Sequence, residues 1–236
     1  MHPAPTFSRD DEKRGQSPAF SRDVQIPPLG LAGTLKHPAG AHALVIFAHG
    51  SGSSRFSPRN IQVAEALNRR GIATLLFDLL LPDEEGDRRN VFDIKLLARR
   101  LAQAVRWTED VPDVTNLPLG LFGASTGAAA ALVAAGVLGD RIGAVVSRGG
   151  RPDLAGDILA DVKAPTLLIV GGEDFGVIEL NQLALQRLEC EKAIEIVPGA
   201  THLFPEAGAL DSVIELAADW FERHLAGKNR KSDARR

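Results

Sequence analysis

Ser125 is the first residue whose surroundings suggest chemistry. It lies in the run Gly123-Ala124-Ser125-Thr126-Gly127, directly after an apolar segment and directly before an alanine-rich one. A serine at a sharp turn from a strand into a helix presents its hydroxyl to solvent, and small neighbours allow the chain to turn tightly. The free N–H groups and the partial positive charge of the helix N-terminus would lie beside that hydroxyl. The pattern predicts that Ser125 is a nucleophile.

A serine hydroxyl is a weak nucleophile until a base removes its proton, and histidine is the usual base. The chain has six histidines, of which only His49 and His202 follow a predicted strand. His202 lies late in the chain, in a loop between the last predicted strand and the last predicted helix, so we predict that it is the base. His49 is interpreted as a packing residue that anchors its loop.

An acidic residue is needed to orient the histidine and to stabilise its protonated form. Two candidates follow the fifth predicted strand in the run Gly171-Gly172-Glu173-Asp174. Asp174 is the preferred candidate because its spacing from the glycines places it in the turn that leaves the strand. Glu173 is the alternative.

Two backbone N–H groups complete the predicted machinery by binding the negatively charged oxygen that forms during acyl transfer. One belongs to Thr126, directly after the nucleophile, and the other to Ser51 in the run His49-Gly50-Ser51-Gly52. Each donor could contribute about 3 kcal/mol of transition-state stabilisation. The alternative for the second run is an ordinary flexible loop, but its position after a buried strand favours the catalytic interpretation.

Three arginines are candidates for holding a carboxylate on the substrate, because a guanidinium group suits bidentate recognition. Arg148 and Arg151 follow the fourth predicted strand, and Arg55 follows the glycine-rich loop. The structural alternative is a pairing with Asp153 or with loop carbonyls. The acidic run at residues 83–85 is interpreted as a solvated loop.

These residues must be positioned by a regular framework, and the sequence predicts one. Short apolar runs typical of strands buried on both faces alternate with segments of helical spacing. The predicted strands are residues 43–48, 73–78, 117–122, 142–146, 165–170 and 193–197; the predicted helices are residues 60–70, 90–107, 126–138, 178–188 and 210–225. An antiparallel hairpin is expected at residues 24–35.

This alternation predicts an α/β protein with a doubly wound, mainly parallel sheet and helices on both faces. Ligands of such sheets gather at the carboxyl ends of the strands, where the residues singled out above all lie. Only residues 147–164 separate the fourth strand from the fifth, which is too short for a cap domain. An open site of this kind suits small acyl groups.

Length and composition narrow the remaining possibilities. The 236 residues fit one domain at 23–227, preceded by a flexible polar lead-in at 1–22 and followed by a basic tail at 228–236. The formal net charge of −3 argues against nucleic acid as the main partner. The sequence shows neither a signal peptide nor an apolar run that could span a membrane, and its single cysteine allows no internal disulfide. These features predict a cytoplasmic monomer or homodimer.

From about residue 24 to the last helix, the chain resembles the α/β-hydrolase superfamily, and within it the dienelactone-hydrolase-like group. The resemblance rests on four motifs in order: His49-Gly50-Ser51-Gly52, Gly123 to Gly127, Gly171 to Asp174, and His202. It implies a hydrolase of carboxylic esters or lactones without metal or organic cofactor. Dienelactone hydrolases proper carry cysteine where this chain has Ser125, so general esterase activity is the stronger expectation.

Other activities are compatible with parts of this pattern. An acyltransferase or a cofactor-free perhydrolase would use the same three residues, because only the acceptor of the acyl group differs. A non-catalytic binding relative would be expected to lack one of them. Related domains occur fused to phosphoribosyltransferases, but this chain has no pyrophosphate-binding pattern that would carry that activity over.

Overall fold

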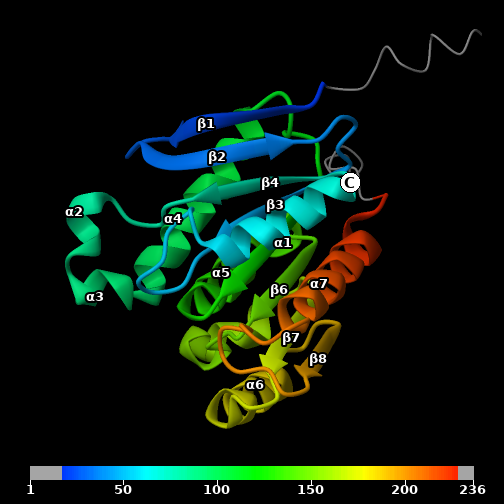
Figure 1. Cartoon of the computed structure of the whole chain (residues 1–236). Helices are drawn as coiled ribbons and strands as arrows, with labels where there is room; N and C mark the ends of the chain where they lie inside the picture. Colours follow the sequence, from blue (N-terminus) through cyan, green and yellow to red (C-terminus); the bar gives the residue numbers. More distant parts are fainter. Residues whose placement is uncertain (1–17, 228–236) are drawn as a thin grey trace, which may run out of the picture.

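A computed structural model describes residues 18–227, which form an eight-stranded sheet with the strand order β1-β2-β4-β3-β5-β6-β7-β8 (Figure 1). The strands are β1 (Phe20–Ile26), β2 (Leu31–His37), β3 (Ala43–Ala48), β4 (Ile72–Phe77), β5 (Leu119–Ala124), β6 (Ala144–Arg148), β7 (Thr166–Gly171) and β8 (Lys192–Val197). The six strands from β3 to β8 are all parallel. The doubly wound α/β fold is therefore confirmed, with six strands within two residues of their predicted bounds.

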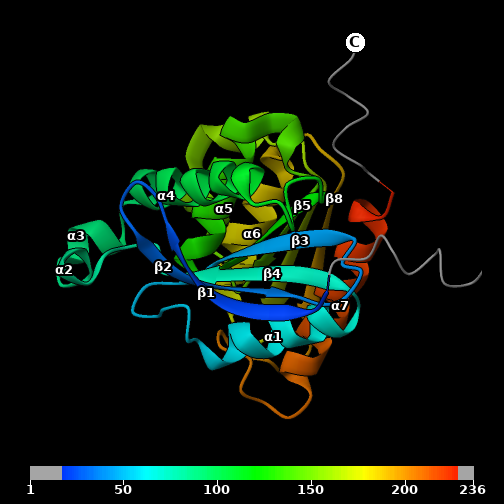
Figure 2. The same ribbon diagram turned by 90° about the horizontal axis from the view of Figure 1, so that it is seen from above.

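Helices cover both faces of the sheet, as Figure 2 shows from above. The longer helices are α1 (Pro58–Arg69), α4 (Ile94–Trp107), α5 (Thr126–Leu138), α6 (Phe175–Arg187) and α7 (Ala209–Leu225), and a 3₁₀ segment spans Pro152–Asp161. Two clusters of buried apolar side chains fill the space between the layers, one under α4 and α5 and the other under α1 and α7. None of the described helices is both long enough and apolar enough to cross a membrane.

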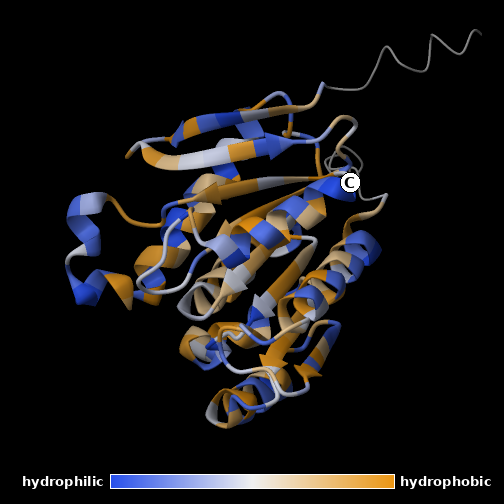
Figure 3. Ribbon diagram, viewed as in Figure 1, coloured by the Kyte–Doolittle hydropathy of each residue, from blue (hydrophilic) through white to orange (hydrophobic). Residues whose placement is uncertain are grey.

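The central strands β3, β4, β5 and β7 are buried at every position, and Figure 3 shows much of the central sheet in orange between helices of mixed colour. A parallel strand with helices on both sides has no solvated face, which explains why these segments are continuous apolar runs instead of alternating ones. Their carboxyl ends all lie along one edge of the sheet, and this edge carries the candidate residues.

The hairpin of β1 and β2 is antiparallel and joins the sheet through pairing of β2 with β4. It is longer than the predicted segment at residues 24–35, because β1 already begins at Phe20 and pairs there with His37. Residues 20–22 therefore belong to the sheet and not to the predicted lead-in. Residues 1–17 of that lead-in, and the predicted basic tail at 228–236, lie outside the described residues.

The segment between β4 and α4 differs from its prediction. The helix predicted at residues 90–107 is confirmed over Ile94–Trp107, but its predicted start is wrong, because α4 begins only after Asp93, whose carboxylate accepts a hydrogen bond from the Leu96 N–H at 2.9 Å. Two short helices precede it, α2 (Pro82–Glu85) and α3 (Arg88–Val91). The acidic run at 83–85 thus forms a helix instead of a loop, and Glu84 ties it to α4 through Arg100 at 2.7 Å.

Candidate active site

Ser125 lies at a strained turn between β5 and α5, with φ 52° and ψ −121°. A positive φ is unfavourable for a residue with a side chain, so the surrounding structure must hold it in place. The Ser125 N–H donates to the Arg148 carbonyl at 3.2 Å, and its carbonyl accepts from the Arg151 N–H at 3.1 Å. The turn is therefore fixed from the neighbouring strand, and the serine side chain remains partly exposed at the edge of the sheet.

The loop after β3 passes directly against this turn, and two glycines make the contact possible. A methyl group in place of the Gly127 hydrogen would lie 2.2 Å from the carbonyl oxygen of Ala48. A methyl group on Gly50 would lie 3.0 Å from the Cβ atom of Ser125. The glycines of the two sequence motifs therefore serve one purpose, which is to bring the loop and the serine together.

His202 and Asp174 form the predicted pair of base and acid, with 2.7 Å between His202 Nδ1 and Asp174 Oδ2. Asp174 immediately precedes α6 but its side chain makes no capping bond to that helix, because the carboxylate is directed at the histidine. A carboxylate can only accept, so Nδ1 carries the hydrogen and Nε2 is left unprotonated and able to act as a base. The alternative acid, Glu173, is exposed.

Backbone contacts bring this pair to the serine. The Glu173 N–H donates to the Ala200 carbonyl at 2.9 Å, which joins the loop after β7 to the loop after β8. A methyl group on Gly149 would lie 3.6 Å from Cε1 of His202. Because Gly149 directly follows the residue whose carbonyl binds the Ser125 N–H, the imidazole lies close to the serine turn. The structure thus gathers the serine, the histidine and the aspartate at one edge.

The two residues predicted to supply the oxyanion donors are hydrogen-bonded to each other, which the sequence did not indicate. The Ser51 N–H donates to the side-chain hydroxyl of Thr126, with 2.9 Å between the nitrogen and Oγ1. The Thr126 side chain is buried at the first position of α5. The loop donor is therefore already bonded to the residue that supplies the other donor.

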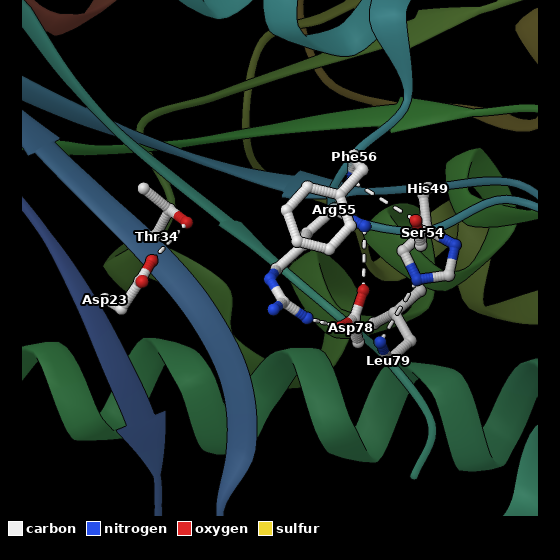
Figure 4. A network of polar contacts seen from close by, with 8 residues as sticks. All are labelled: Asp23, Thr34, His49, Ser54, Arg55, Phe56, Asp78 and Leu79. Carbon is white, nitrogen blue, oxygen red and sulfur yellow. Dashed lines mark hydrogen bonds and ion pairs between the residues drawn. The ribbon is translucent and has the colours of Figure 1, made fainter. Parts of the chain in front are cut away.

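His49 anchors the start of the loop to the end of β4, as Figure 4 shows. Its Nε2 accepts the Leu79 N–H at 3.2 Å, and its Nδ1 lies 3.0 Å from the Gly50 carbonyl oxygen. These partners require the neutral ring with hydrogen on Nδ1. Arg55 anchors the far end of the loop through its backbone N–H and its guanidinium, both bonded to Asp78. The glycine-rich loop is thereby fixed at both ends to one neighbouring strand.

Burial lowers the pKa of His49 below its ordinary value of 6.5, although the Gly50 carbonyl and the carboxylates of Asp78 and Glu85 oppose the shift. The unfolded chain therefore takes up a proton at this histidine at a higher pH than the folded chain does. The neutral ring stabilises the fold fully above pH 6.5, and this contribution is lost as the pH falls toward the lower folded pKa.

We expect the His49→Gln variant to lose that part of the acid sensitivity, since a glutamine oxygen can accept the Leu79 N–H but does not titrate. The difference in slope between the two proteins is at most about 1.4 kcal/mol per pH unit. Urea unfolding between about pH 8 and pH 5 measures it. If the unfolding free energies of the two proteins changed with pH in parallel, titration of His49 would not be the source of this acid sensitivity.

The three predicted substrate arginines fall into two groups. Arg151 forms two hydrogen bonds of 2.8 Å with Asp153, and Arg55 is paired with Asp78. Arg148 is buried and has no ion pair within residues 18–227; its Nη2 lies 3.4 Å from Oδ1 of Asn60. Burial, with a smaller effect of nearby Arg59, lowers the pKa of Arg148 to about 10. Arg151 thus forms the pairing with Asp153 that was the structural alternative, whereas Arg55 pairs with Asp78, which the sequence did not indicate.

A cavity of about 320 Å³ lies on the side of the glycine-rich loop that faces α4. Its wall consists of the loop residues 49–54, which include Gly50 and Ser51, and of apolar side chains from the segment after β4, from α3 and from α4: Leu79, Leu80, Val91 and Leu97. Glu85 is its one acidic wall residue. Sequence reasoning missed this pocket, because the helices α2 and α3 are too short to show a helical period. Within residues 18–227, no cluster of three or more His, Cys, Asp or Glu side chains could hold a metal ion.

Comparisons with known proteins agree with this arrangement. A family model described as an alpha/beta hydrolase domain matches residues 41–215. A protein of Mycobacterium tuberculosis that carries the provisional name phosphoribosyl transferase is 56% identical over 212 residues. The match covers 89% of this chain but 48% of the relative, so the chain spans about half the length of that protein.

Solved structures show the same relationship. The dienelactone hydrolase from Anabaena variabilis is 52% identical, with a TM-score of 0.84 and coverage of 88% of this chain and 98% of that one. Est1E from Butyrivibrio proteoclasticus shares the fold at 18% identity, with a TM-score of 0.73 and coverage of 87% and 99%. The chain belongs to the α/β-hydrolase family, and within it to the dienelactone-hydrolase-like group.

Proposed function

We propose that the protein is a serine hydrolase that cleaves small carboxylic esters through an acyl-enzyme on Ser125. The observation that carries the proposal is the 2.7 Å bond between His202 and Asp174, beside a serine held at a positive φ. A histidine oriented by a carboxylate next to a strained serine is an arrangement suited to acyl transfer.

The first half of the reaction forms the acyl-enzyme. As Oγ of Ser125 bonds to the ester carbonyl carbon, its proton passes to Nε2 of His202, and the carbonyl electron pair moves onto the oxygen. Asp174 stabilises the imidazolium but does not take the proton. The intermediate collapses when the alcohol leaves with the proton from His202. The second half repeats these steps with water in place of the serine hydroxyl and releases the acid.

Two features support a small substrate. The cavity of about 320 Å³ beside Gly50 and Ser51 is at the lower end of the range for small-molecule pockets. Four apolar side chains form one part of its wall, which suits a short hydrocarbon arm. Of the three predicted arginines, Arg148 is the one that forms no ion pair within residues 18–227, so we propose it as the residue that would favour an acidic group on the substrate.

Phosphoribosyl transfer is not part of the proposal. The name of the Mycobacterium tuberculosis relative refers to a protein of which this chain covers 48%. The chain carries no pyrophosphate-binding pattern, whereas its strand ends carry a serine, a histidine and an aspartate in hydrolase order.

Labelling with a fluorophosphonate probe tests the proposal directly, because the probe reacts only with an activated serine. We expect the wild-type protein to be labelled at Ser125, and the Ser125→Ala variant to remain unlabelled. Unlabelled wild-type protein, or equal labelling of the variant, would sink the proposal.

Hydrolysis of a panel of p-nitrophenyl esters then defines the substrate class. The panel pairs neutral butyrate with monoanionic succinate, which differ in charge but little in length. Short esters are expected to be cleaved faster than long ones, and Ser125→Ala provides the background rate.

A further inference from the structure

The hydroxyl of Thr126 belongs to the residue that directly follows Ser125 and contacts the glycine-rich loop. It accepts the Ser51 N–H at 2.9 Å, across 75 residues of sequence. A bond of this length is well formed, so the hydrogen of the Ser51 N–H is directed at Oγ1. The loop N–H is thus already engaged before any substrate arrives.

The loop has little freedom to redirect that N–H. Gly127 packs against the carbonyl of Ala48, and Gly50 packs against Ser125, at distances that leave no space for a methyl group. His49 and Arg55 fix the two ends of the loop to Leu79 and Asp78, directly after β4. A substrate oxygen would have to displace the threonine hydroxyl within this tightly packed contact in order to bind the Ser51 N–H directly.

The threonine hydroxyl keeps its own proton while it accepts this bond, since a hydroxyl is both a donor and an acceptor. No acceptor for that proton is found within residues 18–227. The backbone N–H of Thr126, at the first position of α5, likewise has no protein partner there. One residue, adjacent to Ser125, therefore offers two donors.

We propose that the side-chain hydroxyl of Thr126 is itself a donor of the oxyanion hole and relays the contribution of Ser51. In this arrangement the Ser51 N–H donates to Oγ1, and Oγ1–H donates to the oxyanion beside the Thr126 N–H. A hydroxyl that accepts a hydrogen bond becomes a stronger donor, because successive bonds polarise one another. The inference rests on the proposed function and adds a catalytic side chain to it.

Replacing Thr126 by valine distinguishes this relay from direct donation. Valine keeps the shape but removes the hydroxyl, so the relay predicts a fall in kcat of about a hundredfold with KM nearly unchanged. Direct donation predicts the opposite, because valine would free the Ser51 N–H for the substrate and kcat would be maintained or raised. The Thr126→Ser variant retains the hydroxyl and is expected to recover most of the activity.

A transition-state analogue measures the stabilisation of the oxyanion itself, and recovery in Thr126→Ser separates a role of the hydroxyl from a role of side-chain bulk. A trifluoromethyl ketone forms a tetrahedral oxyanion on the serine, so its inhibition constant is expected to rise about a hundredfold in Thr126→Val. If valine prevents folding, as judged by circular dichroism, Thr126→Ala removes the same hydroxyl without placing a methyl group against the Ser51 N–H and carries the same expectation. An unchanged kcat and inhibition constant in a folded variant overturn the relay.

Different results would contradict the serine hydrolase and the Thr126 relay. Absence of fluorophosphonate labelling in the wild-type protein removes the serine hydrolase, and the relay with it. Normal labelling and ester cleavage in the wild type, together with undiminished kcat in Thr126→Val, remove the relay alone.

Discussion

The Asp174→Asn variant is expected to lose about ten-thousandfold in kcat while remaining folded. An asparagine can turn its NH₂ group toward Nδ1 of His202, which is now 2.7 Å from a carboxylate oxygen. The imidazole would then carry its hydrogen on Nε2 and could no longer accept the serine proton. Steady-state kinetics with the best ester of the panel, and circular dichroism to verify folding, measure the effect.

The neighbouring Glu173→Gln variant is the matched control. Glu173 is exposed and its described contact is made by its backbone N–H, so kcat should change by no more than a fewfold. A large loss in Glu173→Gln together with a small one in Asp174→Asn would show that the alternative carboxylate is the acid.

The Gly127→Ala variant is expected to lose both stability and activity. Its methyl group would lie 2.2 Å from the Ala48 carbonyl oxygen and 2.5 Å from that of His49, both of them backbone atoms. The serine turn and the glycine-rich loop must move apart to remove this overlap. We expect this movement to lower the free energy of unfolding by about 3 kcal/mol. The same movement would break the bond between Ser51 and Thr126.

Gly176→Ala provides the comparison for backbone effects. Gly176 lies in the first turn of α6, and a methyl group there would meet none of the described residues within 4 Å. Alanine is a better helix former, so this variant is expected to be as stable as the wild type, or about 0.5–1 kcal/mol more stable. Urea unfolding of both variants separates the two cases; equal stability of Gly127→Ala and the wild type would contradict the close contact.

The order of strands and helices could be predicted because each buried strand is a continuous apolar run, while the long helices show helical spacing or, in α5, an alanine-rich run. The same local signals placed Ser125, Asp174 and His202 after strands. Parallel strands end at a common edge, so side chains far apart in sequence could be expected to lie together there. The edge contacts of Gly50 and Gly127 follow from the same glycine pattern that indicated the serine turn.

Other features depend on contacts between distant segments that no local pattern reveals. Arg55 meets Asp78 across 23 residues, and Arg148 meets Asn60 across 88. The sequence therefore could not show which arginine is neutralised and which is not. It also could not show that the Thr126 hydroxyl accepts the Ser51 N–H, since both residues were interpreted through their backbone alone.

The glycine-rich loop is anchored to the residues directly after β4. Substitutions can therefore alter the nearby cavity wall without disturbing the loop. His49 and Arg55 hold the loop by bonds to Leu79 and Asp78, and none of these bonds involves α2 or α3. Those short helices contribute Glu85 and Val91 to the wall of the cavity. Insertions or exchanges in α2 and α3 could therefore alter which esters fit while the bond-breaking residues remain in place. During evolution, the cavity wall formed by α2 and α3 could change while the adjacent glycine-rich loop stays the same, because these anchoring bonds do not link the two.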